Sequence, residues 1–370
     1  MFLYLTGFSN TGGIEKFNRS LLKTLHELSV DGVCDADAFS SYDDASDEKY
    51  FPKKRFKGFK KNRLYFLFYT LFVAFKYEQL YIGHINLAVL ACWIKRLKPS
   101  IKLVTIVHGI EAWKEQTGYK KRLLERSDLI LSVSQYTKDQ VLQKNATISA
   151  NSIQLFPNTL DPYFKLPVHF QKPAYLLQRY NLSTQDPLLL TITRLSFSEK
   201  DKGYDRVMQV LLSIKKTYPS LKYLLGGKGD EGETARIKNK IHELNLDNQV
   251  VLTGFIDDEE LIDHFLLGDV FIMPSKKEGF GIVFIEALAC GKIVIAGSKD
   301  GSVDALLNGE LGVLVDPDSL NEIEAAILAA LQNNTHVPFS LQKKVNEVFG
   351  FRQYKKRLAS ILQTSSAVIQ

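Results

Sequence analysis

Short apolar runs of strand length alternate along the chain with amphipathic segments of helix length, and this alternation constrains the fold most. Three long amphipathic segments, 14–28, 205–216 and 320–331, lie among nine apolar runs. Repetition of strand, helix and strand predicts parallel sheets covered by helices on both faces. The apolar runs are FLYLT, LVTIV, LILSV, LLLTIT, KYLLGG, QVVLTG, DVFIMP, KIVIAG and LGVLV.

A cluster of prolines divides this pattern in two. Five of the eleven prolines lie between Pro157 and Pro187, where the alternation breaks, and we interpret this stretch as an interdomain linker. A chain of 370 residues with 45% hydrophobic residues has enough apolar material for two cores. We therefore expect an α/β protein with two doubly wound domains and a ligand-binding cleft between them.

The cysteines and the N-terminus indicate a reducing cytoplasmic setting. The three cysteines are far apart and form no CxxC pair, so the sequence predicts neither a disulfide framework nor a zinc site. The apolar run before Gly7 is too short for a secretion signal and is interpreted as a first strand.

A basic and aromatic segment, Lys53 to Tyr77, leaves two interpretations open. Seven Lys or Arg residues lie between Lys53 and Arg63, and the apolar run 64–75 follows at once. That run is too short to span a bilayer, which needs about 20 residues. It is either a buried helix behind a solvated basic loop or a peripheral contact with an anionic membrane face. Nucleic acid is disfavoured because no recognition motif accompanies the charge.

The most informative stretch is PSKKEGFGIVFIEALACG, residues 274–291. It predicts a strand end, a glycine-containing turn and a helix that begins near Gly281, whose free N–H groups favour an anion. Glu286 lies roughly 7.5 Å further along the helix axis, which suits a ribose beyond a diphosphate. Glu278 is placed to accept hydrogen bonds from hydroxyls of the group that the phosphate carries. The alternative is a buried glutamate paired with a neighbouring Arg or Lys, or one that faces solvent on a helix edge.

Two cations predict how a diphosphate would be neutralised. Arg194 follows the first strand of the second domain, and Lys202 precedes the next helix. Such cations can replace a metal in stabilising a diphosphate leaving group. In the first domain, Gly12 and Gly13 form a loop that can approach a phosphate, and His108 at a strand end is either structural or catalytic.

Two further motifs are interpreted as decoys. Gly227, Gly229 and Gly232 form a literal GxGxxG, but the next strand ends in Thr253 and Gly254 without a ribose-binding acid. We therefore assign this loop to the phosphate or base side of a ligand and disfavour a nicotinamide oxidoreductase. The DxD at 35–37, a pattern that can bind a metal, is interpreted as a polar turn or a strand edge.

Taken together, these motifs resemble the GT-B glycosyltransferases, and within them the retaining family four of the exopolysaccharide type. The resemblance rests on GGIEKFNRSLL, HGIEAW, LFPNTLD, DKGYDR, GGKGDEG and, most specifically, the two-glutamate stretch. It implies a Rossmann-like acceptor-side domain over 1–165, a Rossmann-like donor domain over 166–349, and a final helix over 350–370 that returns to the first domain. It also implies a nucleotide-sugar donor and no metal or cofactor.

The resemblance assigns roles to matching positions. Arg194 and Lys202 would bind the diphosphate, Glu278 and His108 the donor sugar, and Glu286 the ribose. The sequence departs from the family pattern at 300–302, where a Gly-Gly pair is common, and at Asp304, where Glu is usual. The remaining donor-side positions are Gly12, Gly13, Gly227, Gly254, Phe255, Ile256, Gly279, Phe280, Gly281 and Ile282.

The expected activity is transfer of a hexose from a nucleoside diphosphate sugar to a saccharide or lipid-linked saccharide in polysaccharide synthesis. UDP-glucose is the favoured donor and GDP-mannose the alternative. An epimerase or phosphorylase on the same fold, or a silent nucleotide-sugar-binding subunit, stays open. We expect the protein in the cytoplasm, peripheral on the inner face of the plasma membrane if Lys53 to Tyr77 binds lipid.

Overall fold

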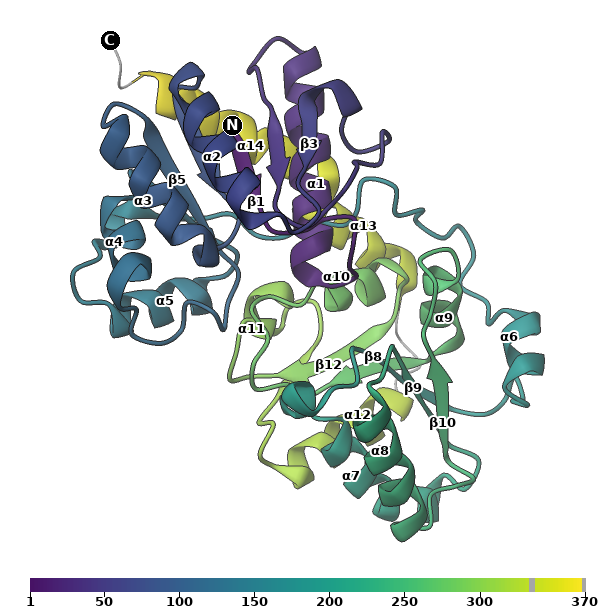
Figure 1. The fold of residues 1–370 in the computed structure, drawn as a ribbon. Coiled ribbons are helices and arrows are strands. Elements are labelled where there is room, and N and C mark those ends of the chain that lie inside the picture. The colour runs from purple at the N-terminus through teal and green to yellow at the C-terminus, as the bar shows by residue number, and fades with distance from the viewer. Residues whose placement is uncertain (333–336, 368–370) are drawn as a thin grey trace. The chain divides into compact units, whose positions relative to one another are not determined.

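The computed structural model describes residues 1–332 and 337–367, and these form two compact units. Unit 1 comprises Met1–Tyr163 and the C-terminal segment from Phe349, and unit 2 comprises Phe164–Val348. Each unit contains one parallel sheet with helices packed on it (Figure 1). The predicted α/β class with two doubly wound sheets is therefore confirmed, and the predicted ligand cleft between the domains stays a prediction.

Unit 1 has a seven-stranded sheet in the order β3-β2-β1-β4-β5-β6-β7. The order reverses between β1 and β4, which pair through Leu3 and Ile82. Loops after these neighbouring strands run to opposite sides, the place where doubly wound sheets bind ligands. The strands are β1 (Phe2–Tyr4), β2 (Ala38–Ser40), β3 (Phe56–Gly58), β4 (Gln79–Ile82), β5 (Lys102–Val107), β6 (Leu129–Ser132) and β7 (Ile153–Leu155).

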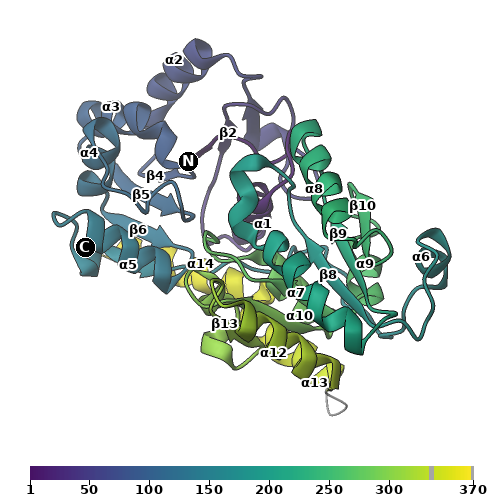
Figure 2. The same cartoon turned by 90° about the horizontal axis from the view of Figure 1, so that it is seen from below.

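The helices of unit 1 bury its sheet. The final helix packs on the first, with the Lys355 Nζ donating to Glu27 Oε2 over 3.0 Å. Helices α2, α3 and α4 lie side by side and contribute buried residues to the hydrophobic core of unit 1 (Figure 2). The helices are α1 (Gly13–Val30), α2 (Arg63–Val73), α3 (Ala88–Leu97), α4 (Gly118–Arg126), α5 (Gln135–Lys144) and α14 (Phe351–Ala367).

Unit 2 has a six-stranded sheet in the order β10-β9-β8-β11-β12-β13, which reverses between β8 and β11. Helices α9 and α10 lie on one face of this sheet, and α7, α8 and α12 on the other (Figure 1). The strands are β8 (Leu188–Ile192), β9 (Lys222–Gly226), β10 (Val250–Gly254), β11 (Val270–Met273), β12 (Ile293–Gly297) and β13 (Val313–Val315).

The helices of unit 2 alternate with its strands along the chain. The four central strands, β8, β9, β11 and β12, are almost entirely buried because both faces are covered, which explains their continuous apolar runs. The helices are α6 (Ala174–Arg179), α7 (Tyr204–Thr217), α8 (Glu231–Glu243), α9 (Leu261–Leu267), α10 (Ile282–Ala289), α11 (Ser302–Ala305), α12 (Leu320–Gln332) and α13 (Pro338–Phe349).

Residues 63–73 form helix α2, as one interpretation of 64–75 predicted, but the helix is buried along one face only. Helix α2 buries Phe66, Thr70 and Val73 against the sheet, but it exposes Leu64 and Phe72. The physical reason is that a helix can contact a sheet along one face only, and this helix is apolar on both faces. In the part of the chain that the structure describes, no helix is long and apolar enough to cross a membrane.

Candidate functional site

The loop 274–281 connects β11 to α10 and packs closely against glycines on other elements. A Cβ at Gly203, Gly297 or Gly301 would come within 2.0 to 2.3 Å of a carbonyl oxygen of this loop. Any side chain at these three positions would therefore displace the loop. At the other end Gly281, with φ of 88°, turns the chain into α10.

Asp300 supports the same loop through hydrogen bonds. Its carboxylate accepts from Ser275 Oγ at 2.7 Å, from the Glu278 N–H at 2.8 Å and from the Ser302 N–H at 2.9 Å. Burial raises the pKa of Asp300 to about 6, although these hydrogen bonds act in the opposite direction. Where the sequence departs from the family pattern, the Asp300 carboxylate and the Gly301 N–H thus bind the backbone of Glu278.

Four charged side chains form a continuous set of ion pairs beside this loop. Lys202 Nζ lies 2.6 Å from Glu278 Oε2 and 3.5 Å from Glu199 Oε2, and Arg194 Nη2 lies 3.4 Å from Glu199 Oε1. Lys202 is the most enclosed of them, with 12% of its side chain exposed. Burial lowers the pKa of Lys202, but Glu278 and then Glu199 outweigh it, and the net pKa is raised. Lys202 is therefore a cation at neutral pH.

The sheet order explains why these residues meet. Arg194 lies two residues after β8, and Lys202 ends the 3-10 helix Phe197–Lys202 that precedes α7. Glu278 follows β11, the strand next to β8 across the reversal. The structure thus brings Arg194, Lys202 and Glu278 to one sheet edge at the switch point. Glu199 was missed by the sequence analysis, since an isolated Glu in a charged loop gives no signal.

The remaining residues of the two-glutamate stretch lie at the start of α10. Gly279 precedes Phe280 and Ile282, whose side chains are buried, and Glu286 is 1% exposed in the second turn. Glu286 therefore lies on the helix that directly follows the loop of Glu278.

The GxGxxG stretch runs along the segment that carries Arg194. The Leu195 N–H donates to the Lys228 carbonyl at 2.9 Å, and Leu195 pairs with Gly229 as a parallel bridge. A Cβ at Gly227 would lie 1.7 Å from the Thr193 carbonyl oxygen. Close backbone packing therefore explains Gly227 without a ligand.

The turn after β10 borders this loop. Gly254 ends the strand with φ of 74°, Phe255 is exposed and Ile256 is buried. A Cβ at Gly226 would lie 2.6 Å from Ile256 Cδ1, so the turn packs directly on the end of β9. Phe255 is left as an aromatic surface at this edge of the sheet.

In unit 1, His108 follows β5 and is held as a neutral imidazole. Its Nε2 lies 2.8 Å from the Gly83 carbonyl oxygen, and its ring packs edge-on against Phe17 at 4.8 Å. Burial lowers the pKa of His108 to about 4. Because a carbonyl can only accept, Nε2 carries the proton and Nδ1 retains the lone pair.

Asp43 is a second residue that the sequence analysis missed. Its buried carboxylate accepts from the hydroxyls of Thr6 and Ser40 and from the N–H groups of Gly7 and Ser9, over 2.7 to 2.9 Å. These bonds fix the loop that follows β1 and leads to Gly12 and Gly13, where α1 begins. Apart from Ser40, these partners are 34 to 37 residues away from Asp43, so no local pattern could have revealed this role.

The DxD pair is bound by an arginine. Arg55 Nη1 donates to Asp37 Oδ1 at 3.2 Å, and Arg55 also pairs with Asp35. Both aspartates directly precede β2, so these contacts agree with a polar strand edge and not with a turn. Over residues 1–332 and 337–367, no three His, Cys, Asp or Glu residues are grouped closely enough to hold a metal ion.

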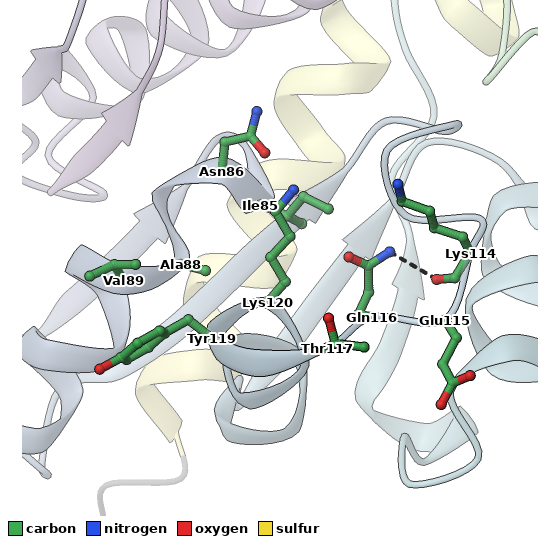
Figure 3. A pocket seen from close by; sticks show the side chains of 10 residues that line it. All are labelled: Ile85, Asn86, Ala88, Val89, Lys114, Glu115, Gln116, Thr117, Tyr119 and Lys120. Carbon is green, nitrogen blue, oxygen red and sulfur yellow. Dashed lines mark hydrogen bonds between the residues drawn. The ribbon is translucent and has the colours of Figure 1, made fainter.

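Unit 1 also has a cavity of about 340 Å³ between α3 and α4. Figure 3 shows Lys120 extending into it, while Glu115 points away. Gln116 donates to the Lys114 carbonyl oxygen at 2.8 Å and so fixes the loop that forms one wall. Its lining residues are Ile85, Asn86, Ala88, Val89, Lys114, Glu115, Gln116, Thr117, Tyr119 and Lys120.

The fold and the site define a class of proteins, and comparison with known families identifies it. Residues 176–367 match the family described as glycosyl transferases group 1, and residues 11–164 match the one described as glycosyltransferase family 4. The chain belongs to the glycosyl transferases group 1 family. The resemblance to GT-B glycosyltransferases is thereby confirmed.

Individual relatives are more distant. A GDP-mannose-dependent alpha-(1-6)-phosphatidylinositol monomannoside mannosyltransferase of Mycobacterium tuberculosis is 29% identical over 247 residues, which cover 64% of this chain and 62% of the relative. Mannosylfructose-phosphate synthase of Agrobacterium fabrum is 25% identical, over 55% of this chain and 45% of the relative. The chain thus matches less than two thirds of the length of these relatives.

Solved structures share the fold over the full chain. HepE of Anabaena, crystallised with UDP, has a TM-score of 0.79 and 19% identity, covering 98% of this chain and 99% of HepE. Sucrose-phosphate synthase of Thermosynechococcus elongatus has a TM-score of 0.78 and 21% identity, covering 99% of both chains. At these identities the likeness establishes the GT-B fold alone.

Proposed function

We propose that the chain is a metal-independent, retaining hexosyltransferase. It moves a hexose from a nucleoside diphosphate sugar to a hydroxyl of a saccharide or lipid-linked saccharide. The observation that carries this proposal is the ion-pair set around Lys202 and Glu278 at the strand switch of unit 2. In a member of this family, that edge of the sheet is where an anionic nucleotide would bind.

The ion pairs indicate how a diphosphate would be received. Without donor, each cation is paired with a carboxylate, so the largely enclosed Lys202 is not left as an uncompensated charge. A bound diphosphate would pair with both cations in place of the carboxylates. The two cations would then neutralise its charge, as a metal does in other enzymes. Glu278 would then accept hydrogen bonds from hydroxyls of the donor sugar.

The other assignments follow the resemblance and stay predictions. The backbone of 279–281 would contact the distal phosphate, Glu286 the ribose, and the turn 254–256 the base. His108 would contact the donor sugar, with Nδ1 accepting a sugar hydroxyl because Nε2 already donates to Gly83. Gly12 and Gly13 would approach the phosphate.

Retention of configuration follows from a reaction on one face of the sugar. The bond between the anomeric carbon and the diphosphate oxygen breaks, and the acceptor oxygen bonds to the same face. The acceptor proton passes to the leaving diphosphate. This route requires no second carboxylate across the sugar, unlike the carboxylate pair of a glycoside hydrolase.

Two donors are candidates. UDP-glucose is the donor that the sequence analysis favours. GDP-mannose is supported by a separate observation, since relatives 28 to 29% identical to this chain are named as GDP-mannose-dependent. A lipid-linked saccharide is the favoured acceptor, because the basic and apolar segment Lys53 to Tyr77 would bring the enzyme to an anionic membrane.

An epimerase, a phosphorylase and a silent binding subunit are the competing functions. Product analysis distinguishes them, because an epimerase converts the donor without acceptor and a phosphorylase needs inorganic phosphate. A silent subunit would bind donor and release no product with any acceptor.

Donor binding is tested by calorimetric titration of the protein, without metal, with UDP, GDP, ADP and NAD. We expect one nucleoside diphosphate to bind and the Glu286→Ala variant to lose that binding. Binding of NAD alone would contradict the proposal and would return the GxGxxG loop to a dinucleotide role.

A further inference from the structure

Helix α2 leaves one side apolar and exposed. Leu64, Phe68 and Phe72 recur at intervals of four residues and are 65 to 77% exposed, and Tyr65 and Phe75 flank them. Residues four apart lie on one face of a helix, so these side chains form a continuous strip. A strip of large aromatic groups of this length is unusual on a protein surface that contacts only water.

Helix α3 carries a second strip that the sequence analysis did not detect. Val89, Trp93 and Leu97 also recur every four residues and are 44 to 56% exposed. The two helices contact each other and lie side by side in Figure 2. Their ends are tied, since Lys98 Nζ donates to the Phe75 and Tyr77 carbonyl oxygens at 3.0 and 2.6 Å. We call the eight exposed residues the α2–α3 face: Leu64, Tyr65, Phe68, Phe72, Phe75, Val89, Trp93 and Leu97.

The segment that contains this face is strongly basic, although Arg55, Lys60 and Lys95 pair with carboxylates from outside it. Residues 53–102 contain twelve Lys or Arg residues and a single acidic residue, Glu78. The whole chain has a formal charge of +6, so the rest of the chain is net negative. Lys61 and Arg63 are exposed at the start of α2, and Lys76 and Arg96 are exposed towards the other ends of the two helices.

We propose that the α2–α3 face seats in the interface of a bilayer that contains anionic lipids. The aromatic and aliphatic strips enter the boundary between headgroups and acyl chains, and the surrounding cations contact the phosphates. Trp93 and Tyr119 suit this boundary because their rings are apolar and their N–H and O–H groups are polar. Trp93 Nε1 and Tyr119 Oη lie 3.5 Å apart at this surface.

A second copy of the chain fits the face less well than a bilayer. A symmetric contact would place the same patch on itself and bring its cations together. An anionic lipid surface complements both features of the face, the apolar strips and the positive rim. This inference uses α3 and does not depend on glycosyl transfer, so it can be tested without donor or acceptor.

Tryptophan fluorescence tests the seating directly, because the chain has only two tryptophans, Trp93 and Trp113. In Trp113→Phe only Trp93 reports. In Trp93→Phe only Trp113 reports, and its Nε1 donates to Thr137 Oγ1 at 3.1 Å away from the face. With phosphatidylglycerol-containing vesicles we expect a shift of Trp93 emission to shorter wavelength and quenching by brominated acyl chains. Trp113 emission should not respond.

Matched variants distinguish insertion of the α2–α3 face from nonspecific binding of exposed apolar side chains to vesicles. Phe68→Ser with Phe72→Ser should weaken vesicle binding about tenfold or more, since two exposed phenyl rings are removed. Val30→Ser with Val168→Ser removes two equally exposed apolar side chains elsewhere and should leave vesicle binding unchanged. Circular dichroism and nucleotide titration of both variants check that the fold and the donor site are kept.

Three outcomes would overturn the proposal. The first is that Trp93 emission does not respond to vesicles. The second is that phosphatidylcholine vesicles bind as well as anionic ones, which would remove the role of the cations. The third is a shift of Trp93 emission that depends on protein concentration without lipid, which would assign the face to a second copy.

Discussion

Lys202 is a largely enclosed cation between two carboxylates, and these ion pairs bear directly on the proposed binding of a diphosphate. Glu278 and Glu199 both pair with it, so the lysine is ionised before any donor arrives. A charge that is already in place needs no reorganisation when a diphosphate binds. The same carboxylates compete with the diphosphate for the cation.

That competition gives a prediction for Glu199, whose side chain is 23% exposed. Glu199→Gln should tighten binding of the nucleoside diphosphate by about two- to fivefold, because one negative charge leaves the neighbourhood of Arg194 and Lys202. The measurement is calorimetric titration at fixed ionic strength. Glu243→Gln, an exposed position on α8, serves as the control and should not change binding. Weaker binding in Glu199→Gln would place the diphosphate elsewhere.

Asp300 gives a prediction for pH. Burial raises its pKa from 3.8 to about 6 in the folded chain. Its contribution to stability is therefore fully present below about pH 4 and is lost as pH rises through 6. Relative to Asp300→Asn, which does not titrate, the wild type should lose about 2 to 3 kcal/mol of unfolding free energy between pH 4 and pH 7.

Denaturant unfolding at several pH values measures this difference. Asp257→Asn, at an exposed position, is the matched control and should leave the pH dependence unchanged. A difference between wild type and Asp300→Asn that does not change with pH would mean that Asp300 is ionised throughout.

Residues within one motif could be predicted from the sequence, whereas their supports could not. Glu278 and Gly281 lie in one contiguous stretch with an evident strand-to-helix context. Asp300 and Asp43 accept from backbone N–H groups 22 and 34 to 36 residues away, and their positions carry no repeated pattern. Only the folded chain brings them to the loops that they hold.

At the scale of elements, every predicted apolar run contains a strand, and the segments 14–28, 205–216 and 320–331 are helices. Four strands were missed: β2, β3, β4 and β7. Three of them have only three residues, which is too short for a periodic signal, and they are specified by pairing with a neighbour. Helix α2 was predicted as a helix or a membrane segment, but its exposed side depends on which face meets the sheet.

Helix α14 gives a prediction at this scale. Tyr354 is fully buried, with its ring 4.5 Å from that of Phe156 and 6.2 Å from that of Phe17. Within the described part of the chain, its hydroxyl has no hydrogen-bond partner. Tyr354→Phe should therefore be neutral or stabilise the protein by up to about 1 kcal/mol, whereas Tyr354→Ala should cost about 3 to 5 kcal/mol.

Thermal and denaturant unfolding of the two variants measures this pair of effects. Both changes should act on unit 1 and leave nucleotide binding by unit 2 unchanged at temperatures below unfolding. A large loss of stability in Tyr354→Phe would show that the hydroxyl is hydrogen-bonded in solution.

At the scale of the whole molecule, the chain leaves unit 1, builds unit 2 and returns. The hydroxyl of Thr159 and the N–H of Leu160 both donate to the Phe349 carbonyl oxygen, at 2.7 and 3.0 Å, where the returning segment meets the outgoing one. The prolines of 157–187 indicated the outgoing crossing in the sequence. A final helix that returns to the first domain was expected from the family resemblance, and not from a local pattern.

The most direct test of the account is hexose transfer by the purified protein in the presence of a chelator. UDP-glucose and GDP-mannose are supplied with lipid-linked saccharide acceptors. The wild type and the exposed-site control Glu259→Ala should form product from one donor, with retained anomeric configuration. Glu278→Ala should keep its fold and lose about a hundredfold or more in turnover. Full turnover in Glu278→Ala, or transfer that requires a divalent metal, would contradict the account.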